Sequence, residues 1–200
     1  MLKLYEKLPI EDMKGNNWIV LATSFGGVPI AKEIAKKIGA QFDFLFNEKV
    51  YMSKNNECEI AIVTETSEIV IHEELMRSFS LNLDDIYHKA NFVLHTKVQE
   101  HKANYRDSLD IIDLKDRSVL LIDEGLNTGL TMMACIKSAI SEGAKSISVA
   151  VPVLPSVIIK DIESIADDLF YVQALEHFVS IDFYYNTLEK VVLKQIRSIQ

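Results

Sequence analysis

Two adjacent carboxylates, Asp123 and Glu124, are the residues of this sequence best placed to do chemistry. They directly follow the apolar run SVLLI, residues 118–122, and they precede the turn GLNTGLT, residues 125–131. Like charges repel and a buried carboxylate loses its solvation, so such a pair needs compensating donors. We expect both side chains to face a ligand with two neighbouring hydroxyls, because each carboxylate can accept a hydrogen bond from one of them.

The turn that follows has the composition of a phosphate-binding loop. It combines small residues, consecutive backbone amides and the hydroxyls of Thr128 and Thr131, and it opens a helical pattern. It is not a Walker A loop, because Leu130 stands where that loop requires lysine, and it lacks the GxGxxG spacing of a dinucleotide site. Carboxylates for a diol beside amides for a phosphate predict a sugar phosphate as the ligand.

Strand and helix patterns alternate along the chain and must position these residues. We predict strands at 18–23, 42–46, 58–64, 118–123, 146–154 and 169–175, with a polar loop at 47–57. Helices are expected from 28 to a stop at Gly39, and at 83–106, 131–142, 156–166 and 187–199. This alternation predicts one α/β domain over residues 1–200, with a mostly parallel twisted sheet covered by helices on both faces.

Composition limits the classes of function. Lysine and arginine number 21 against 29 acidic residues, and this net charge of −8 argues against a nucleic-acid partner, since such binding needs a basic surface. No stretch is long and apolar enough for a membrane span, and no leader pattern opens the chain, so we expect a cytoplasmic protein without a membrane partner. Cys58 and Cys135 are isolated and are expected to be reduced core residues.

The segment VLLIDEGLNTGLT, residues 119–131, resembles the phosphoribosyl pyrophosphate (PRPP) signature of the type I phosphoribosyltransferase family. Its flanks agree: residues 26–43 and 105–155 resemble a bacterial subgroup of predicted phosphoribosyltransferases, and the similarity covers about residues 15–185. The resemblance implies a Rossmann-like core with a small hood, a homodimer, and transfer of 5-phosphoribosyl from PRPP to a nitrogenous base, purine-type or unknown, with release of pyrophosphate.

The same resemblance implies roles for individual residues. Asp123 and Glu124 would be the catalytic carboxylates that hold the ribose hydroxyls and help to bind Mg²⁺. The implied substrate-binding residues are Gly125, Asn127, Thr128, Gly129, Leu130, Thr131, Gly26, Gly27, Lys49 and Arg106. For the Gly-Gly pair an ordinary strand-to-helix turn is the alternative, and for Lys49 and Arg106 the alternative is a plain surface charge.

Three positions depart from the family pattern. Phe25 stands where an arginine commonly precedes the Gly-Gly pair, Glu48 stands where relatives tend to carry arginine, and Asn127 replaces the aspartate of purine-salvage members. An amide cannot act as a base at neutral pH. These departures favour a second hypothesis, a non-catalytic sensor that binds PRPP or a nucleotide. A third is an interaction protein that has kept only the fold.

The remaining candidates are histidines and aromatic residues. The stretch IHEELM does not form the HExxH zinc motif, because Met76 stands in place of the second histidine. We predict that His88, His95 and His101 lie on the solvated face of the helix at 83–106. The aromatic residues that would belong to the hood are Phe178, Tyr184 and Tyr185.

Overall fold

The main sheet is parallel, as the alternation of strands and helices predicts. The structure is a computed structural model that describes residues 2–52 and 55–177. In this part of the chain five strands pair in the order β2-β1-β6-β7-β8, and every pairing is parallel. The strands are β1 (Trp18–Ala22), β2 (Gln41–Phe44), β6 (Ser118–Ile122), β7 (Ser146–Pro155) and β8 (Asp168–Leu175).

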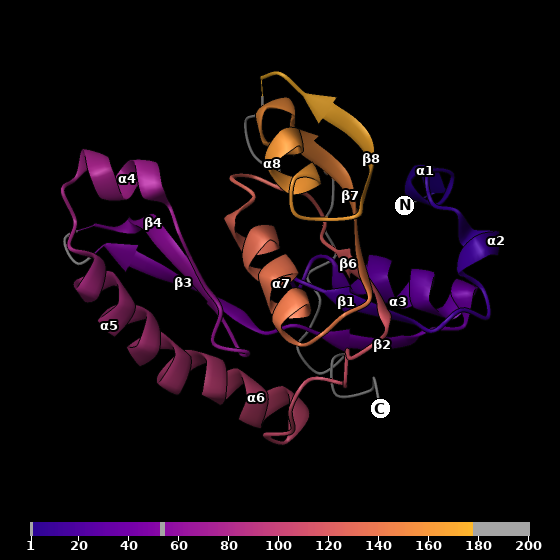
Figure 1. Cartoon of the computed structure of the whole chain (residues 1–200), viewed down its shortest axis with the longest axis horizontal. Helices are drawn as coiled ribbons and strands as arrows, with labels where there is room; N and C mark the ends of the chain where they lie inside the picture. The colour runs from indigo at the N-terminus through magenta and orange to yellow at the C-terminus, as the bar shows by residue number, and fades with distance from the viewer. Residues whose placement is uncertain (1, 53–54, 178–200) are drawn as a thin grey trace.

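Helices cover both faces of this sheet (Figure 1). The even-numbered residues of β1 and β6 pack in one core cluster with α3 (Val28–Ile38). The odd-numbered residues pack in a second cluster with α7 (Leu130–Ser141) and α8 (Ile159–Glu163). Because successive side chains of a strand point to opposite faces, the continuous apolar runs of β1 and β6 serve both clusters.

Local signals in the sequence mark the ends of α3 correctly. Pro29 lies in its first turn, where the missing amide hydrogen leaves no bond unmade. Gly39 ends the helix with a φ of 70°, a left-handed conformation that glycine adopts without steric cost. Two short helices that the sequence patterns did not predict, α1 (Leu2–Tyr5) and α2 (Ile10–Met13), precede β1.

Residues 47–106 form a second substructure, which we call the arm, and it projects from the main sheet in Figure 1. It contains the antiparallel sheet β3 (Asn47–Met52), β4 (Asn55–Thr64) and β5 (Ile69–Ile71). The predicted polar loop at 47–57 is therefore wrong, because most of it is strand. Within β3 only Val50 is buried, so the sequence of this segment has no apolar pattern that indicates a strand. It is a strand because it pairs with β4.

The predicted long helix at 83–106 is present and packs against the antiparallel sheet of the arm. It comprises α5 (Leu83–Val93), a π-helical turn η1 (Leu94–Val98) and α6 (Gln99–Arg106), and α4 (Glu73–Ser78) precedes it. Its side chains Ile86, Ala90, Leu94 and Val98 are buried in the cluster that also contains Val50. The spacing of three or four residues thus identified the inward face.

The C-terminal predictions have a mixed outcome. The helix expected at 156–166 is shorter, with a 3₁₀ turn η2 (Ser156–Ile158) followed by α8. The helix expected at 187–199 and the hood aromatics Phe178, Tyr184 and Tyr185 lie outside the described residues. Within the described ranges, no helix has the length and apolar character to cross a membrane.

Candidate functional site

A cavity of about 440 Å³ lies at the carboxyl ends of β1 and β6, where ligands of open α/β sheets bind. Four parts of the chain line it. They are the loop at 23–26, Phe44 and Phe46 at and just after the end of β2, the acidic strand end and turn at 123–129 with Thr131 and Met132, and the arm through residues 47–49, Glu59 and His101. Almost all the sequence-predicted site residues come together here. The exceptions are Gly27 and Leu130, which lie directly behind the lining, and Arg106.

Asp123 is buried, with 5% of its surface exposed, and three donors hold its carboxylate. The Thr23 hydroxyl donates to Oδ2 at 2.7 Å, the Ser24 hydroxyl donates to Oδ1 at 3.0 Å, and the Gly125 amide contacts Oδ1 at 3.3 Å. Burial, and then the charge of Glu124, raise the pKa of Asp123 well above its usual range, although the bonds from Thr23 and Gly125 act to lower it. Further donors or a cation would therefore stabilise the charged form.

The Ser24 hydroxyl connects both carboxylates to the loop after β1. Its oxygen also contacts Glu124 Oε2, and it accepts a hydrogen bond from the Gly27 amide at 3.1 Å. A serine hydroxyl carries one hydrogen and can donate it to only one carboxylate at a time. A ligand hydroxyl could supply the second donor, which is the arrangement expected for a vicinal diol.

Sequence reasoning missed Thr23 and Ser24 as site residues. Their position follows from the register of the sheet, in which Ala22 pairs with Ile122, so that the residues after each strand meet. Parallel strands end at the same edge of a sheet, and two hydroxyl residues directly after an apolar strand were the available signal.

The turn at 125–131 places its amides at the start of α7. Gly129 has a φ of 78° and precedes the helix, a conformation that explains the glycine at this position. Asn127 and Thr128 are exposed at the cavity, and the Thr128 hydroxyl accepts a hydrogen bond from the Leu130 amide at 3.4 Å. The Leu130 side chain points the other way and packs with Ile62 and Val70 of the arm.

The Gly-Gly pair approaches the acidic strand end closely. A methyl group added to Gly27 would lie 2.9 Å from the Ile122 carbonyl oxygen and 3.1 Å from Asp123 Cα. The three atoms nearest to a methyl group added to Gly26 would be those of the Glu124 carboxylate group, at 2.6 to 2.9 Å. Both glycines therefore allow the loop at 23–26 to lie against Asp123 and Glu124, and Gly27 is held against backbone that cannot yield.

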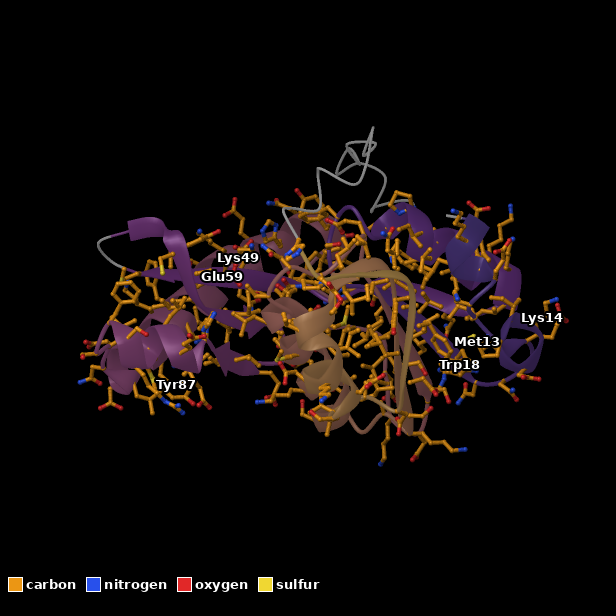
Figure 2. The ribbon with its side chains drawn as sticks, turned by 90° about the horizontal axis from the view of Figure 1, so that it is seen from above. Met13, Lys14, Trp18, Lys49, Glu59 and Tyr87 are labelled. Carbon is orange, nitrogen blue, oxygen red and sulfur yellow. The ribbon has the colours of Figure 1, made fainter. Side chains whose placement is uncertain are left out.

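An ion pair and a histidine–carboxylate contact of the arm line the cavity. Lys49 Nζ lies 2.8 Å from Glu59 Oε2 (Figure 2), and His101 Nε2 lies 2.7 Å from Glu48 Oε1. Burial acts to lower the pKa of Lys49, but the hydrogen bond and charge of Glu59 outweigh it and the pKa is raised. Among the described residues that line the cavity, Lys49 is the only lysine or arginine, and an acidic partner neutralises it.

The prediction that His101 lies on a solvated face is wrong. Only 28% of its side chain is exposed, and its ring stacks on Phe46 and Tyr105 at centroid distances of 6.2 and 5.8 Å. The spacing contained this information, because His101 comes three residues after the buried Val98 and four before Tyr105. The neighbouring Phe25 stacks on Phe44 at 5.0 Å and joins the same aromatic group.

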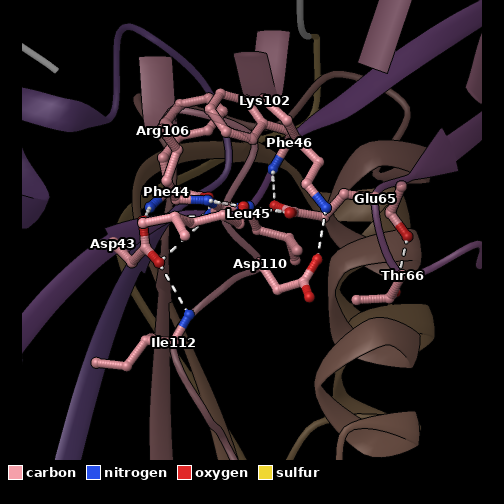
Figure 3. A network of polar contacts seen from close by, with 12 residues as sticks. Asp43, Phe44, Leu45, Phe46, Glu65, Thr66, Lys102, Arg106, Asp110 and Ile112 are labelled. Carbon is pink, nitrogen blue, oxygen red and sulfur yellow. Dashed lines mark hydrogen bonds and ion pairs between the residues drawn. The ribbon is translucent and has the colours of Figure 1, made fainter. Parts of the chain in front are cut away.

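Arg106 lies outside the cavity lining, in a buried polar network shown in Figure 3. Its guanidinium contacts both oxygens of Asp43 at 3.3 Å, donates to the Phe44 carbonyl at 3.0 Å and forms an ion pair with Glu65. The hypothesis of a plain surface charge is therefore wrong, and the structure does not bring Arg106 to Asp123. Burial raises the pKa of Glu65 to about 7, although the charge of Arg106 and the bond from the Phe46 amide act to lower it.

The metal prediction rests on a small set of oxygen ligands. Asp123 and Glu124 are hard donors of the kind that Mg²⁺ prefers. Among the residues that the structure describes, no group of three or more His, Cys, Asp or Glu side chains could hold a metal ion. The pair therefore suits a cation that takes its other oxygens from substrate and water. Cys58 and Cys135 are free thiols, as predicted.

Comparison with known proteins relates the chain to phosphoribosyl transferases. Residues 4–185 match the family model described as phosphoribosyl transferase domain. Two Mycobacterium tuberculosis proteins, one from each of two strains and both named "Putative phosphoribosyl transferase", are 28% identical over 163 residues. This match covers 80% of the chain but 36% of each relative, so the chain spans about a third of their length.

A solved structure agrees at the level of the fold. The crystal structure of a Thermus thermophilus protein matches with a TM-score of 0.76 at 23% sequence identity. The match covers 98% of this chain and 91% of that one. The predicted α/β fold of the type I phosphoribosyltransferase kind is confirmed.

Replacing Gly27 with alanine should destabilise the protein by about 1–3 kcal/mol, because the added methyl group would press against the backbone of β6. Gly26→Ala is the matched control, since the Glu124 carboxylate can swing away from its methyl group. Urea unfolding of both variants measures the difference. Equal stability of Gly27→Ala and the unmodified protein would contradict the close approach.

Stability should fall as pH rises from about 4.5 to about 7, the pKa values of Glu65 in the unfolded and the folded chain. Within this pH range the unfolded chain loses the proton of Glu65 while the folded chain keeps it. The expected loss from this group is about 3 kcal/mol, and Glu65→Gln should remove most of it. Urea unfolding across this pH range provides the test, with the exposed Glu163→Gln as control. An unchanged pH dependence in Glu65→Gln would count against the raised pKa.

Proposed function

The chain belongs to the phosphoribosyl transferase domain family, and on that premise we propose that it transfers 5-phosphoribosyl from PRPP to a nitrogenous base and releases pyrophosphate. The observation that carries this proposal is the acidic pair of the buried Asp123 and the partly buried Glu124, which lies beside the amide-rich turn at 125–131 in one cavity. The carboxylates supply acceptors for the ribose hydroxyls, and the turn supplies donors for the 5-phosphate.

Other residues have roles that follow from the same placement. The loop at 23–26 would receive the pyrophosphate group, because Gly26 has no side chain between its backbone and the cavity beside Glu124. Cleavage of the bond to pyrophosphate leaves positive charge on the ribose ring, and the buried carboxylates would stabilise that charge. This electrostatic effect needs the pair in its charged form. Hydrogen bonds from Thr23, Ser24 and the Gly125 amide act toward that form, against burial and the charge of Glu124, which together raise the pKa of Asp123.

Mg²⁺ fits the donor set as a bound partner of the substrate. Asp123 and Glu124 would hold it, directly or through water, and its charge would neutralise the pyrophosphate oxygens. Its presence would also offset the repulsion between the two carboxylates. We therefore expect the protein to bind PRPP with Mg²⁺ more tightly than PRPP alone.

Isothermal titration calorimetry with PRPP and Mg²⁺ tests the binding half of the proposal. Asp123→Asn should raise the Kd about tenfold or more, because an amide cannot replace a carboxylate that accepts from ribose hydroxyls. Asp161→Asn, at an exposed position of α8, is the control and should bind as the unmodified protein does. Absence of any heat of binding for the unmodified protein would rule out PRPP as the ligand.

The charge balance of the arm favours a second candidate, a sensor that binds PRPP or a nucleotide without turnover. The charge of Lys49 is neutralised by Glu59, and the residue before Lys49 is the acidic Glu48. Phe25, in the proposed pyrophosphate loop, has an aromatic ring and no charge. These features weaken the hold on a leaving anion.

A panel of purine and pyrimidine bases separates the two candidates. With PRPP and Mg²⁺ present, a transferase should release pyrophosphate with at least one base, and a coupled assay measures the release. A sensor should bind PRPP in calorimetry and release nothing above the rate without a base. Because both candidates need Asp123, its substitution does not discriminate between them.

A further inference from the structure

The roles proposed above for a sugar phosphate do not use the contact between Glu48 and His101. The pair joins β3 to α6 through a contact of 2.7 Å between the Glu48 carboxylate and Nε2 of the imidazole. Stacking on Phe46, at an interplanar angle of 11°, and on Tyr105, at 19°, sets the plane of the imidazole. Both members of the pair are partly exposed, and both line the cavity.

This pair belongs to the same cavity as the acidic strand end. Phe25, which directly precedes the Gly-Gly pair, has its ring centroid 6.2 Å from that of His101. The wall of the cavity therefore runs from the pyrophosphate loop to the imidazole through one aromatic side chain. His101 and Asp123 line the same cavity, so a base bound against this wall would lie beside His101 in the cavity proposed to hold the ribose.

The chemistry of a histidine bonded to a carboxylate is specific. A carboxylate accepts the hydrogen of one ring nitrogen and so favours the tautomer in which the other nitrogen is a proton acceptor. With Nε2–H donated to Glu48, Nδ1 of His101 is that acceptor. The aromatic contacts hold the ring in place, so the orientation does not have to be set anew when a ligand binds.

Transfer to a neutral base requires such an acceptor. The ring nitrogen of the base forms a bond to the anomeric carbon, the bond from that carbon to pyrophosphate breaks, and pyrophosphate leaves with the electron pair. The proton on the attacking nitrogen must then be removed. Asn127 cannot take it, and Glu59 is bound to Lys49.

We propose that His101, oriented by Glu48, is the general base that takes this proton at Nδ1. The role rests on the proposed transferase function. The imidazolium that results is stabilised by the Glu48 carboxylate beside it. The inference also defines the acceptor as a neutral nitrogenous base that carries hydrogen on its reacting nitrogen. Carboxylate-bearing bases are disfavoured, because Glu48, Glu59, Asp123 and Glu124 all line the cavity.

Steady-state kinetics of pyrophosphate release, with the best base of the panel, tests this role. His101→Gln should lower kcat about 100-fold or more, while Glu48→Gln should lower it about tenfold because the imidazole loses its orientation. The Kd for PRPP in calorimetry should change by less than about twofold in both variants. His95→Gln, at an exposed position six residues earlier in the same helix, is the matched control and should keep full activity.

Chemical rescue distinguishes proton transfer from a structural role. Added imidazole should restore part of the turnover of His101→Ala and should leave the rate of the unmodified protein unchanged. A His101→Gln variant with normal kcat, or a His101→Ala variant that folds and binds PRPP but is not rescued, would overturn the role of His101 alone. An unmodified protein that releases no pyrophosphate with any base would overturn the transferase function, and this role with it.

Discussion

The parallel pairing of β1 with β6 is the constraint on which the site depends. Its register sets Ala22 beside Ile122, so the chain leaves both strands at the same point of the sheet edge. Two hydroxyls from one strand end then meet two carboxylates from the other. Without that register Asp123 would be a buried charge with few donors, which is an unfavourable arrangement in any fold.

The arm adds a second, opposite kind of electrostatics to the same cavity. At the sheet edge the two carboxylates Asp123 and Glu124 stand side by side, whereas the two acidic side chains of the arm that line the cavity, Glu59 and Glu48, contact Lys49 and His101. The ion pair of Lys49 with Glu59 contributes little net field, so this part of the wall is suited to recognising a neutral partner. The two adjacent carboxylates Asp123 and Glu124 are suited to a cation or to a ring that gains positive charge. One cavity thus offers distinct environments to the two halves of a reaction.

Features that depend on neighbours in the sequence were predictable, and those that depend on distant partners were not. The turn at 125–131 and the ends of α3 could be identified because glycine, proline and threonine act within a few residues. Ser24 could not, since its partner Asp123 lies 99 residues away. Arg106 was predicted to bind substrate, with a surface charge as the alternative, because its partners Asp43 and Glu65 come together only in the folded chain. For His101 the helical spacing indicated the inward face, but the prediction of a solvated face followed the polar character of its side chain.

Leu130 has a consequence for anyone who wishes to exchange parts between relatives of this protein. Its amide belongs to the turn at the cavity, while its side chain packs with Ile62 and Val70 of the arm. A transplanted arm with a different outline at those two positions would tilt the turn, even if every residue of the turn were kept. Residues 62, 70 and 130 therefore form one module that has to be grafted together, although they are far apart in the chain.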